Sequence, residues 1–138
     1  MTVFKKIDHI AIAVENLDRA IETYARVLGL RAQHREYIED YGVEIATLAI
    51  GDTAIELLEG RSERSPIRRF VESRGPGLHH LAFVVDDIRK ALDTLRAEGV
   101  KLIDETPRRG KDNSLVAFIH PKATERVLYE LVELDAKD

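Results

Sequence analysis

Cysteine is absent from this chain of 138 residues. The absence excludes disulfides, zinc–thiolate sites and thiol nucleophiles. No apolar run approaches the roughly 20 residues that a membrane-spanning helix needs. The segment Met1-Thr2-Val3-Phe4-Lys5-Lys6 lacks the apolar region of a signal peptide. We therefore expect a cytoplasmic protein with no membrane partner.

An excess of positive charge is also missing. The chain has 21 lysines and arginines against 25 aspartates and glutamates, which gives a formal net charge of −4. This balance provides no attractive field for nucleic acid, so we expect no nucleic-acid partner. With 44% hydrophobic and 33% charged residues, the composition is typical of soluble globular proteins. The length suits a single domain over residues 1–138.

An internal repeat is the main pattern that the chain does have. The segment Asp8-His9-Ile10-Ala11-Ile12-Ala13-Val14 is similar to His79-His80-Leu81-Ala82-Phe83-Val84-Val85, which lies 71 positions later. The alignment places His9 on His80, and it continues through the residues that follow each segment. Two copies are too few for a solenoid. The repeat therefore predicts a pseudo-symmetric domain built from two modules.

Each module is predicted to have the element order βαβββ, which makes the fold class α+β. Module 1, about residues 5–60, has a strand at 7–14, a helix at 17–28 between Asn16 and Gly29, and strands near 31–37, 42–50 and 53–58. A connector and a short helix that begins at Ser65-Pro66 occupy residues 61–77. Module 2, about residues 78–135, has a strand at 79–85, a helix near 87–98 and strands near 100–104, 114–119 and 126–133, with a polar loop at 107–113.

Strand periodicity separates two faces of the predicted sheet. His9, Ala11 and Ala13 share one face of their strand, and the larger apolar residues between them share the other. The helix that follows is amphipathic and suits the larger apolar face. Helices can cover only one face of the combined curved, mixed sheet. We expect the other face to form a concave cavity.

Two histidines and two glutamates repeat on this second face. His9 and His80 open the modules, and Glu56 and Glu130 lie in the last strand of each, within apolar surroundings. A single strand histidine is usually structural, and a glutamate in an apolar strand usually reaches solvent at an edge. The repetition of all four favours a metal site instead. Two imidazoles and two carboxylates suit cobalt, manganese, nickel or zinc.

The remaining polar residues allow more than one interpretation. Glu44 shares a strand face with Ala46 and Leu48, so it points either into the cavity or to solvent at the strand end. His79 faces the opposite side from His80 and is expected to be structural. We expect exposure for His34 and a turn position for His120. Several basic residues are either solvated or meet phosphates at the cavity rim: Arg68, Arg69, Arg108, Arg109 and Lys111.

The chain resembles the vicinal oxygen chelate superfamily and, within it, the methylmalonyl-CoA epimerases. The resemblance covers nearly the whole chain in order. It rests on Asp8–Val14, Gly51–Glu59, Ser65–Ile67, Gly77–Phe83, Leu102–Glu105, His120–Lys122 and Val127–Leu131. Glyoxalase I would share the histidine and glutamate positions, whereas the segments at 65–67, 77–83 and 120–131 are more specific.

This resemblance implies a metal-dependent epimerase that interconverts (R)- and (S)-methylmalonyl-CoA. It implies that His9, Glu56, His80 and Glu130 hold a divalent cation, with cobalt as the first expectation. It also implies a homodimer and an acyl-CoA thioester substrate. Two glutamates would exchange the α-proton from opposite faces of an enolate, and the candidates are Glu130 and Glu44. The alternatives are a glyoxalase I-type isomerase of a hemithioacetal and a metal-free protein that sequesters a small hydrophobic drug.

Overall fold

The computed structural model describes residues 4–135, and the chain divides into two compact units. The unit of residues 9–79 is called the His9 unit here, and the unit formed by residues 1–8 and 80–138 is called the His80 unit. Each boundary falls inside a strand, immediately before His9 in β1 (Phe4–Ala13) and before His80 in β5 (Gly77–Val85).

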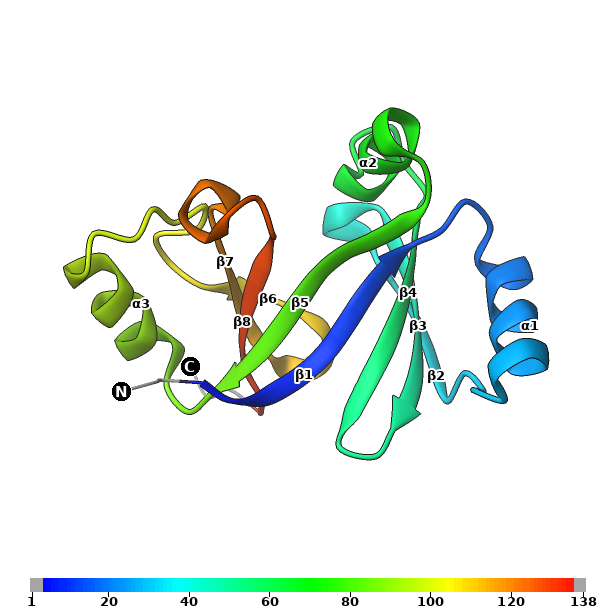
Figure 1. Ribbon diagram of the computed structural model, residues 1–138, viewed down its shortest axis with the longest axis horizontal. Helices are drawn as coiled ribbons and strands as arrows, with labels where there is room; N and C mark the ends of the chain where they lie inside the picture. Colours follow the sequence, from blue (N-terminus) through cyan, green and yellow to red (C-terminus); the bar gives the residue numbers. More distant parts are fainter. Residues whose placement is uncertain (1–3, 136–138) are drawn as a thin grey trace. The chain divides into compact units, whose positions relative to one another are not determined.

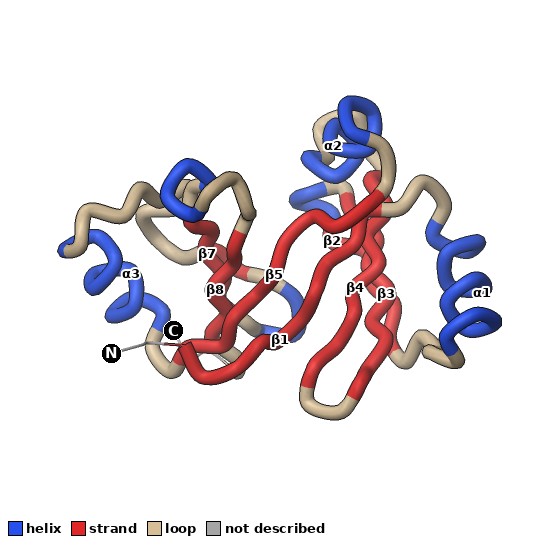
Figure 2. The backbone as a smooth tube through the Cα atoms, viewed as in Figure 1, coloured by secondary structure: helices blue, strands red, loops and turns tan. Residues whose placement is uncertain are grey.

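The His9 unit contains a four-stranded mixed sheet in the order β2-β3-β4-β1 (Figures 1 and 2). Its elements after β1 are α1 (Leu17–Leu28), β2 (His34–Ile38), the short 3₁₀ helix η1 (Glu39–Tyr41), β3 (Val43–Ile50), β4 (Thr53–Gly60) and α2 (Pro66–Arg74). β1 runs parallel to β4, while the other pairs are antiparallel. This order follows from βαβ connectivity, in which a helix carries the chain between parallel strands.

Helices lie on both faces of the His9 unit's sheet. α1 packs Leu17 against Leu48 and Leu57 on one face. On the opposite face, α2 packs Ile67 against Val43, Ile45 and Leu58, among others. The amphipathic pattern of β1 predicted the face that α1 covers. The expectation that helices cover only one face is wrong for this unit, because Ile67 makes α2 pack on the second face as well.

The His80 unit repeats this arrangement in the order β5-β8-β7-β6. Its further elements are α3 (Ile88–Ala97), β6 (Arg108–Arg109), η2 (Lys111–Asn113), β7 (Leu115–Ile119), η3 (Pro121–Thr124) and β8 (Tyr129–Glu133). β5 and β8 are parallel, and the remaining pairs are antiparallel. α3 packs Ile88 and Leu92 against Leu131 of the sheet. The predicted α+β fold of two βαβββ modules is confirmed.

Both module helices begin in the same way. Asn16 and Asp87 are the N-caps, and each side chain accepts a hydrogen bond from a backbone N–H three residues later. A second acceptor comes from the sheet. Glu59 Oε1 accepts from the Leu17 N–H at 2.6 Å, and Glu133 Oε1 accepts from the Ile88 N–H at 2.9 Å. The first turn of each helix is thus bound to the last strand of its own module.

One predicted strand is absent from the structure. Residues 100–104 form only an isolated bridge, between Leu102 and Ile119, instead of a strand. The Asp104 side chain accepts the Phe118 N–H at 2.8 Å, so a carboxylate replaces the backbone partner that would extend the ladder. The edge strand is instead β6, inside the segment predicted to be a loop. That prediction of residues 107–113 as wholly loop is therefore wrong.

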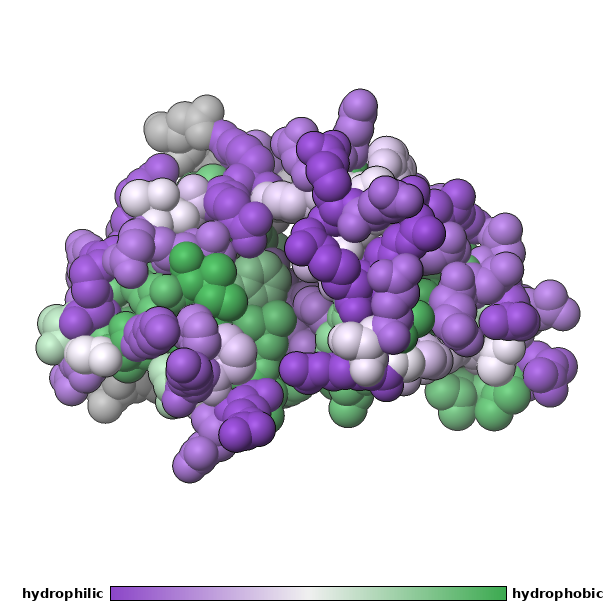
Figure 3. Space-filling model, turned by 90° about the horizontal axis from the view of Figure 1, so that it is seen from above, coloured by the Kyte–Doolittle hydropathy of each residue, from purple (hydrophilic) through white to green (hydrophobic). Residues whose placement is uncertain are grey.

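The surface view in Figure 3 is mostly hydrophilic, with apolar side chains gathered in smaller groups. Exposed large apolar residues include Val27, Leu28 and Leu78. The longest described helix, α1, has 12 residues. None of the described helices is both long and apolar enough to span a membrane.

Candidate metal centre

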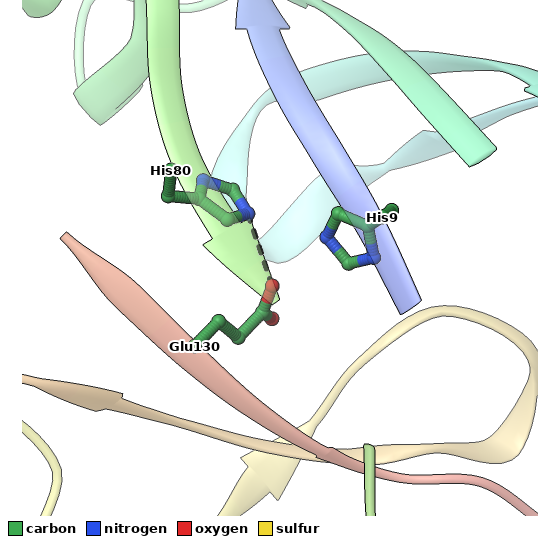
Figure 4. Close-up of side chains that lie close together, drawn as sticks. All are labelled: His9, His80 and Glu130. Atoms are coloured by element: carbon green, nitrogen blue, oxygen red, sulfur yellow. Dashed lines mark ion pairs between the residues drawn. The ribbon is translucent and has the colours of Figure 1, made fainter. Parts of the chain in front are cut away.

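In the His80 unit, a buried histidine and a buried glutamate lie side by side on one face of the sheet. Ala82 of β5 is in register with Glu130 of β8, and His80 is two residues before Ala82. Residues two apart share a face of a strand, so all three side chains leave the sheet on the same side. His80 Nε2 lies 3.0 Å from Glu130 Oε1 (Figure 4). His80 and Glu130 are each 7% exposed.

The His9 unit carries an equivalent pair. Ala11 of β1 is in register with Glu56 of β4, and His9 is two residues before Ala11. His9 Nδ1 lies 3.5 Å from Glu56 Oε2. His9 is 6% exposed and Glu56 is 5% exposed. The repeat seen in the sequence is therefore also a repeat of strand register, because each glutamate pairs with the alanine two residues after its histidine.

The neighbours of the two pairs differ in size. Ala11 and Ala82 are fully buried, and each is in register with the glutamate of its pair and two residues after the histidine. In the His80 unit, Phe118 of β7 is in register with Glu130, and its ring meets the His80 ring edge-on at a centroid distance of 5.3 Å. In the His9 unit, the residue in register with Glu56 on β3 is Thr47. These neighbours define the site face of each sheet.

The donor set fits a divalent cation. An ionised carboxylate that loses its hydration needs a compensating positive charge or hydrogen bonds, and both glutamates are almost completely buried. Each pair provides one imidazole nitrogen and one carboxylate oxygen, the donors that borderline divalent ions accept. The residues present therefore suit zinc, cobalt, nickel or manganese better than a thiolate-preferring ion.

Glu44 does not lie on the site face of its sheet. It is in register with Glu59, whereas Glu56 is in register with Thr47, and the alternation of β3 places Glu44 and Thr47 on opposite faces. Its carboxylate binds Arg35 at 2.6 Å and Arg61 at 2.5 Å. The hydrogen bond that Arg35 donates to the Glu44 carboxylate is the main cause that raises the pKa of Arg35 above its usual value. The prediction that Glu44 faces the cavity is wrong.

A different carboxylate lies on the site face of the His9 unit. Glu36 of β2 is in register with Ile45, which shares a face of β3 with Thr47. His34 Nε2 lies 3.1 Å from Glu36 Oε1. As predicted, His34 is exposed, but it stands on the same face as Glu56 because its register partner is Thr47. The sequence argument treated His34 in isolation and did not identify the pair.

Comparison with known proteins decides the family. The model of the Glyoxalase/Bleomycin resistance protein/Dioxygenase superfamily matches residues 8–118. The chain belongs to this superfamily. The superfamily match includes both histidines and Glu56, and it ends at Phe118, before Glu130.

Relatives within the superfamily match a larger share of the chain. The mitochondrial methylmalonyl-CoA epimerase of Dictyostelium discoideum is 38% identical over 129 residues, which cover 93% of this chain and 78% of that protein. The crystal structure of methylmalonyl-CoA epimerase from Mycobacterium tuberculosis has 42% identity and a TM-score of 0.92, and the match covers 97% of this chain and 91% of that chain.

A second solved structure contains a ligand. It is a variant of the Streptomyces coelicolor methylmalonyl-CoA epimerase in complex with 2-nitronate-propionyl-CoA. This protein is 36% identical to the present chain, the TM-score is 0.92, and 96% of each chain is covered. These homologues confirm the resemblance to methylmalonyl-CoA epimerases.

The other two histidines have local structural roles in this superfamily member. The His79 ring packs edge-on against Phe70 of α2, with ring centroids 4.9 Å apart. His120 Nδ1 accepts the Lys122 N–H at 3.1 Å and caps the η3 turn, as its predicted turn position suggests. Desolvation lowers the pKa of His120, with help from Lys101 and Lys122, and the neutral ring can keep accepting this hydrogen bond.

Proposed function

We infer that this chain catalyses the interconversion of (R)- and (S)-methylmalonyl-CoA. The observation that supports this most strongly is the repeated buried histidine–glutamate pair, found in a chain that matches methylmalonyl-CoA epimerases over both units. A binding protein without chemistry has no need to bury two carboxylates beside two imidazoles. A buried carboxylate costs stability unless a positive charge or a metal ion compensates it, so two such groups in one chain favour a functional site.

The first element of the proposal is a single divalent cation held by His9, Glu56, His80 and Glu130, with cobalt the first candidate. The equivalent register of the two pairs and the chemistry of the four donors support it. When bound, such a cation stabilises negative charge on the thioester oxygen of the substrate. All four side chains are buried, and the attraction between a cation and a developing negative charge is stronger where water is excluded.

The second element is proton transfer by carboxylates. A proton next to a thioester carbonyl is weakly acidic, and a positioned carboxylate removes it efficiently. Glu130 is the candidate for this role, since it is buried, and His80 contacts its Oε1. Inversion also needs a proton delivered to the opposite face of the carbon. Among the described strand residues, Glu36 is the other carboxylate on a site face besides Glu56 and Glu130, so we propose it as the second group.

The decisive experiment measures exchange of the substrate α-proton in heavy water. The wild-type protein should incorporate deuterium into methylmalonyl-CoA and convert one epimer to the other. His80→Ala should lose both bound cobalt and exchange, because one nitrogen donor is gone and Glu130 loses its partner. Full exchange by a metal-free His80→Ala protein would contradict the metal-dependent mechanism.

A glyoxalase-type reaction is the second candidate, because that chemistry uses the same kinds of donors and the superfamily model includes glyoxalases. Consumption of a hemithioacetal, without deuterium uptake into methylmalonyl-CoA, would identify it. Elemental analysis tests the drug-sequestering alternative, since a protein of that type would contain no stoichiometric metal after supplementation. We also propose a homodimer in the cytoplasm, to be measured by light scattering and by localisation of the tagged full chain.

A further inference from the structure

Among the described residues of β5, β6, β7 and β8, one positively charged side chain lies on the site face of the His80 unit and has no role in the proposed reaction. Arg108 of β6 is in register with Val116 of β7. Val116 shares a strand face with Phe118, and Phe118 is in register with Glu130. The Arg108 side chain therefore leaves the sheet on the same face as Glu130, although β6 is the edge strand.

Two contacts hold the Arg108 guanidinium in place. Its Cζ lies 5.8 Å from the centroid of the Phe118 ring, within the range of a cation–π interaction. Its Nε lies 3.0 Å from Asp104 Oδ1, and its Nη2 lies 3.3 Å from Asp104 Oδ2. The Asp104 side chain is only 12% exposed, and it also accepts the Phe118 N–H. The guanidinium is thus oriented by the protein itself, which reduces the entropy lost when a ligand binds.

A single aromatic ring separates this guanidinium from the His80–Glu130 pair. Phe118 contacts Arg108 over its face, and its ring meets the His80 ring in a T-shaped arrangement. The Arg108 side chain is 42% exposed, so it is accessible to a ligand that enters from solvent.

We propose that Arg108 binds the free carboxylate of the acyl group and so selects malonyl-type thioesters over simple acyl thioesters. This inference rests on the proposed function, because it assigns a substrate group to the same site. A planar guanidinium matches a carboxylate through two parallel hydrogen bonds. The acyl carboxylate is only a few bonds from the reacting carbon, whereas the CoA phosphates lie beyond the whole pantetheine arm. Proximity to His80 therefore favours the carboxylate as the ligand.

The test compares the affinities of malonyl-CoA and propionyl-CoA by calorimetry, because these compounds differ in the carboxylate. Arg108→Gln should weaken malonyl-CoA binding about ten- to a hundred-fold and change propionyl-CoA binding less than about two-fold. Arg108→Lys keeps the charge but loses the planar fork, so it should give an intermediate loss. Thermal unfolding checks that each variant is folded.

Arg109→Gln is the matched control. Arg109 lies on the same strand and carries the same charge, but it is in register with Leu115 on the opposite face and donates to Asn113. It should leave the preference for malonyl-CoA unchanged. An equal loss in both variants would mean that general charge, and not a defined contact, attracts the ligand, and would overturn the proposal.

Pantetheine thioesters, which lack the CoA phosphates, separate the two possible anionic groups. If Arg108 contacts the carboxylate, the effect of Arg108→Gln should persist with malonyl-pantetheine. If the effect disappears, Arg108 contacts a phosphate and the proposal is wrong. Because these are binding measurements, they remain informative if the wild-type protein shows no α-proton exchange. In that case the proposed function fails, while a carboxylate preference that depends on Arg108 would still stand.

Discussion

At the scale of single residues, the two modules present different charges from equivalent places. Glu36 of β2 and Arg108 of β6 each lie on an edge strand. Glu36 is in register with Ile45, two residues before Thr47, which pairs with Glu56. Arg108 is in register with Val116, two residues before Phe118, which pairs with Glu130. The module repeat is therefore symmetric in its buried histidine–glutamate pairs and asymmetric in its outer residues. Under the proposed function, this difference suits a substrate with a thioester at one end and a carboxylate at the other.

The role of Glu36 can be tested against Glu44, which is close to it in sequence but on the other face. Glu36→Gln should reduce the rate of epimerisation about a hundred-fold or more, the usual contribution of a general acid or base. Exchange of the α-proton should differ between the two epimers. It should fall less in the epimer whose proton faces Glu130, because that carboxylate is still present. The measurement is the ratio of deuterium uptake to inversion for each epimer.

Glu44→Gln is the control for this experiment, since its carboxylate binds Arg35 and Arg61. We expect near-normal turnover and a loss of stability of about 1 kcal/mol, typical of partly exposed ion pairs. A Glu44→Gln protein with slow turnover and a normal Glu36→Gln protein would reverse the assignment.

At the scale of secondary-structure elements, each module uses its last strand twice. Glu56 and Glu130 point to the site face, and three residues later Glu59 and Glu133 point to the helix face and accept from the first N–H of α1 and α3. Three residues along a strand reverse the face, so one short segment links the site to the helix that covers the sheet. A carboxylate at a helix N-terminus is also favoured by the helix dipole.

Replacing these helix-bound glutamates should cost stability without removing metal. We expect Glu59→Gln and Glu133→Gln each to lower the free energy of unfolding by about 1.5–3 kcal/mol, the range for hydrogen bonds to a charged group. Because the two lie in different units, their effects should be nearly additive. Urea unfolding provides the measurement.

Glu98→Gln serves as the reference substitution, because Glu98 is an exposed residue at the C-terminal end of α3. Loss of its negative charge there should be neutral or slightly stabilising. A loss comparable to that of Glu133→Gln would mean that general charge, and not the helix-capping contact, explains the result.

At the scale of the whole molecule, the proposal requires two units to contribute to one cation. Cobalt at about a hundred times its dissociation constant should then stabilise the folded chain by about 2.7 kcal/mol. Metal analysis should give one ion per chain. His9→Ala and His80→Ala should each abolish this binding, although the two residues belong to different units. Two ions per chain, with only one lost in each variant, would instead indicate two separate sites.

Much of the fold and the two buried histidine–glutamate pairs of the candidate site could be predicted from the sequence, because the signals are local or repeated. Alternation in β1 and β5 determined which residues share a face with His9 and His80, and Asn16 and Gly29 marked both ends of α1. The repeat then identified Glu56 and Glu130 without any knowledge of pairing. Each of these inferences depends on spacing along the chain alone.

Only the tertiary structure decided the face of Glu44 and the places of Glu36 and Arg108. Both faces of β3 carry apolar residues, because α1 covers one face and α2 packs on the other. The hydrophobic pattern of the strand therefore could not show which face carries the site. The pairing of β3 with β4 determines the face, and a shift of one residue would have reversed it. In the same way, the side chain of Asp104 ends one strand pairing and fixes Arg108, and such long-range contacts have no periodic signal in the sequence.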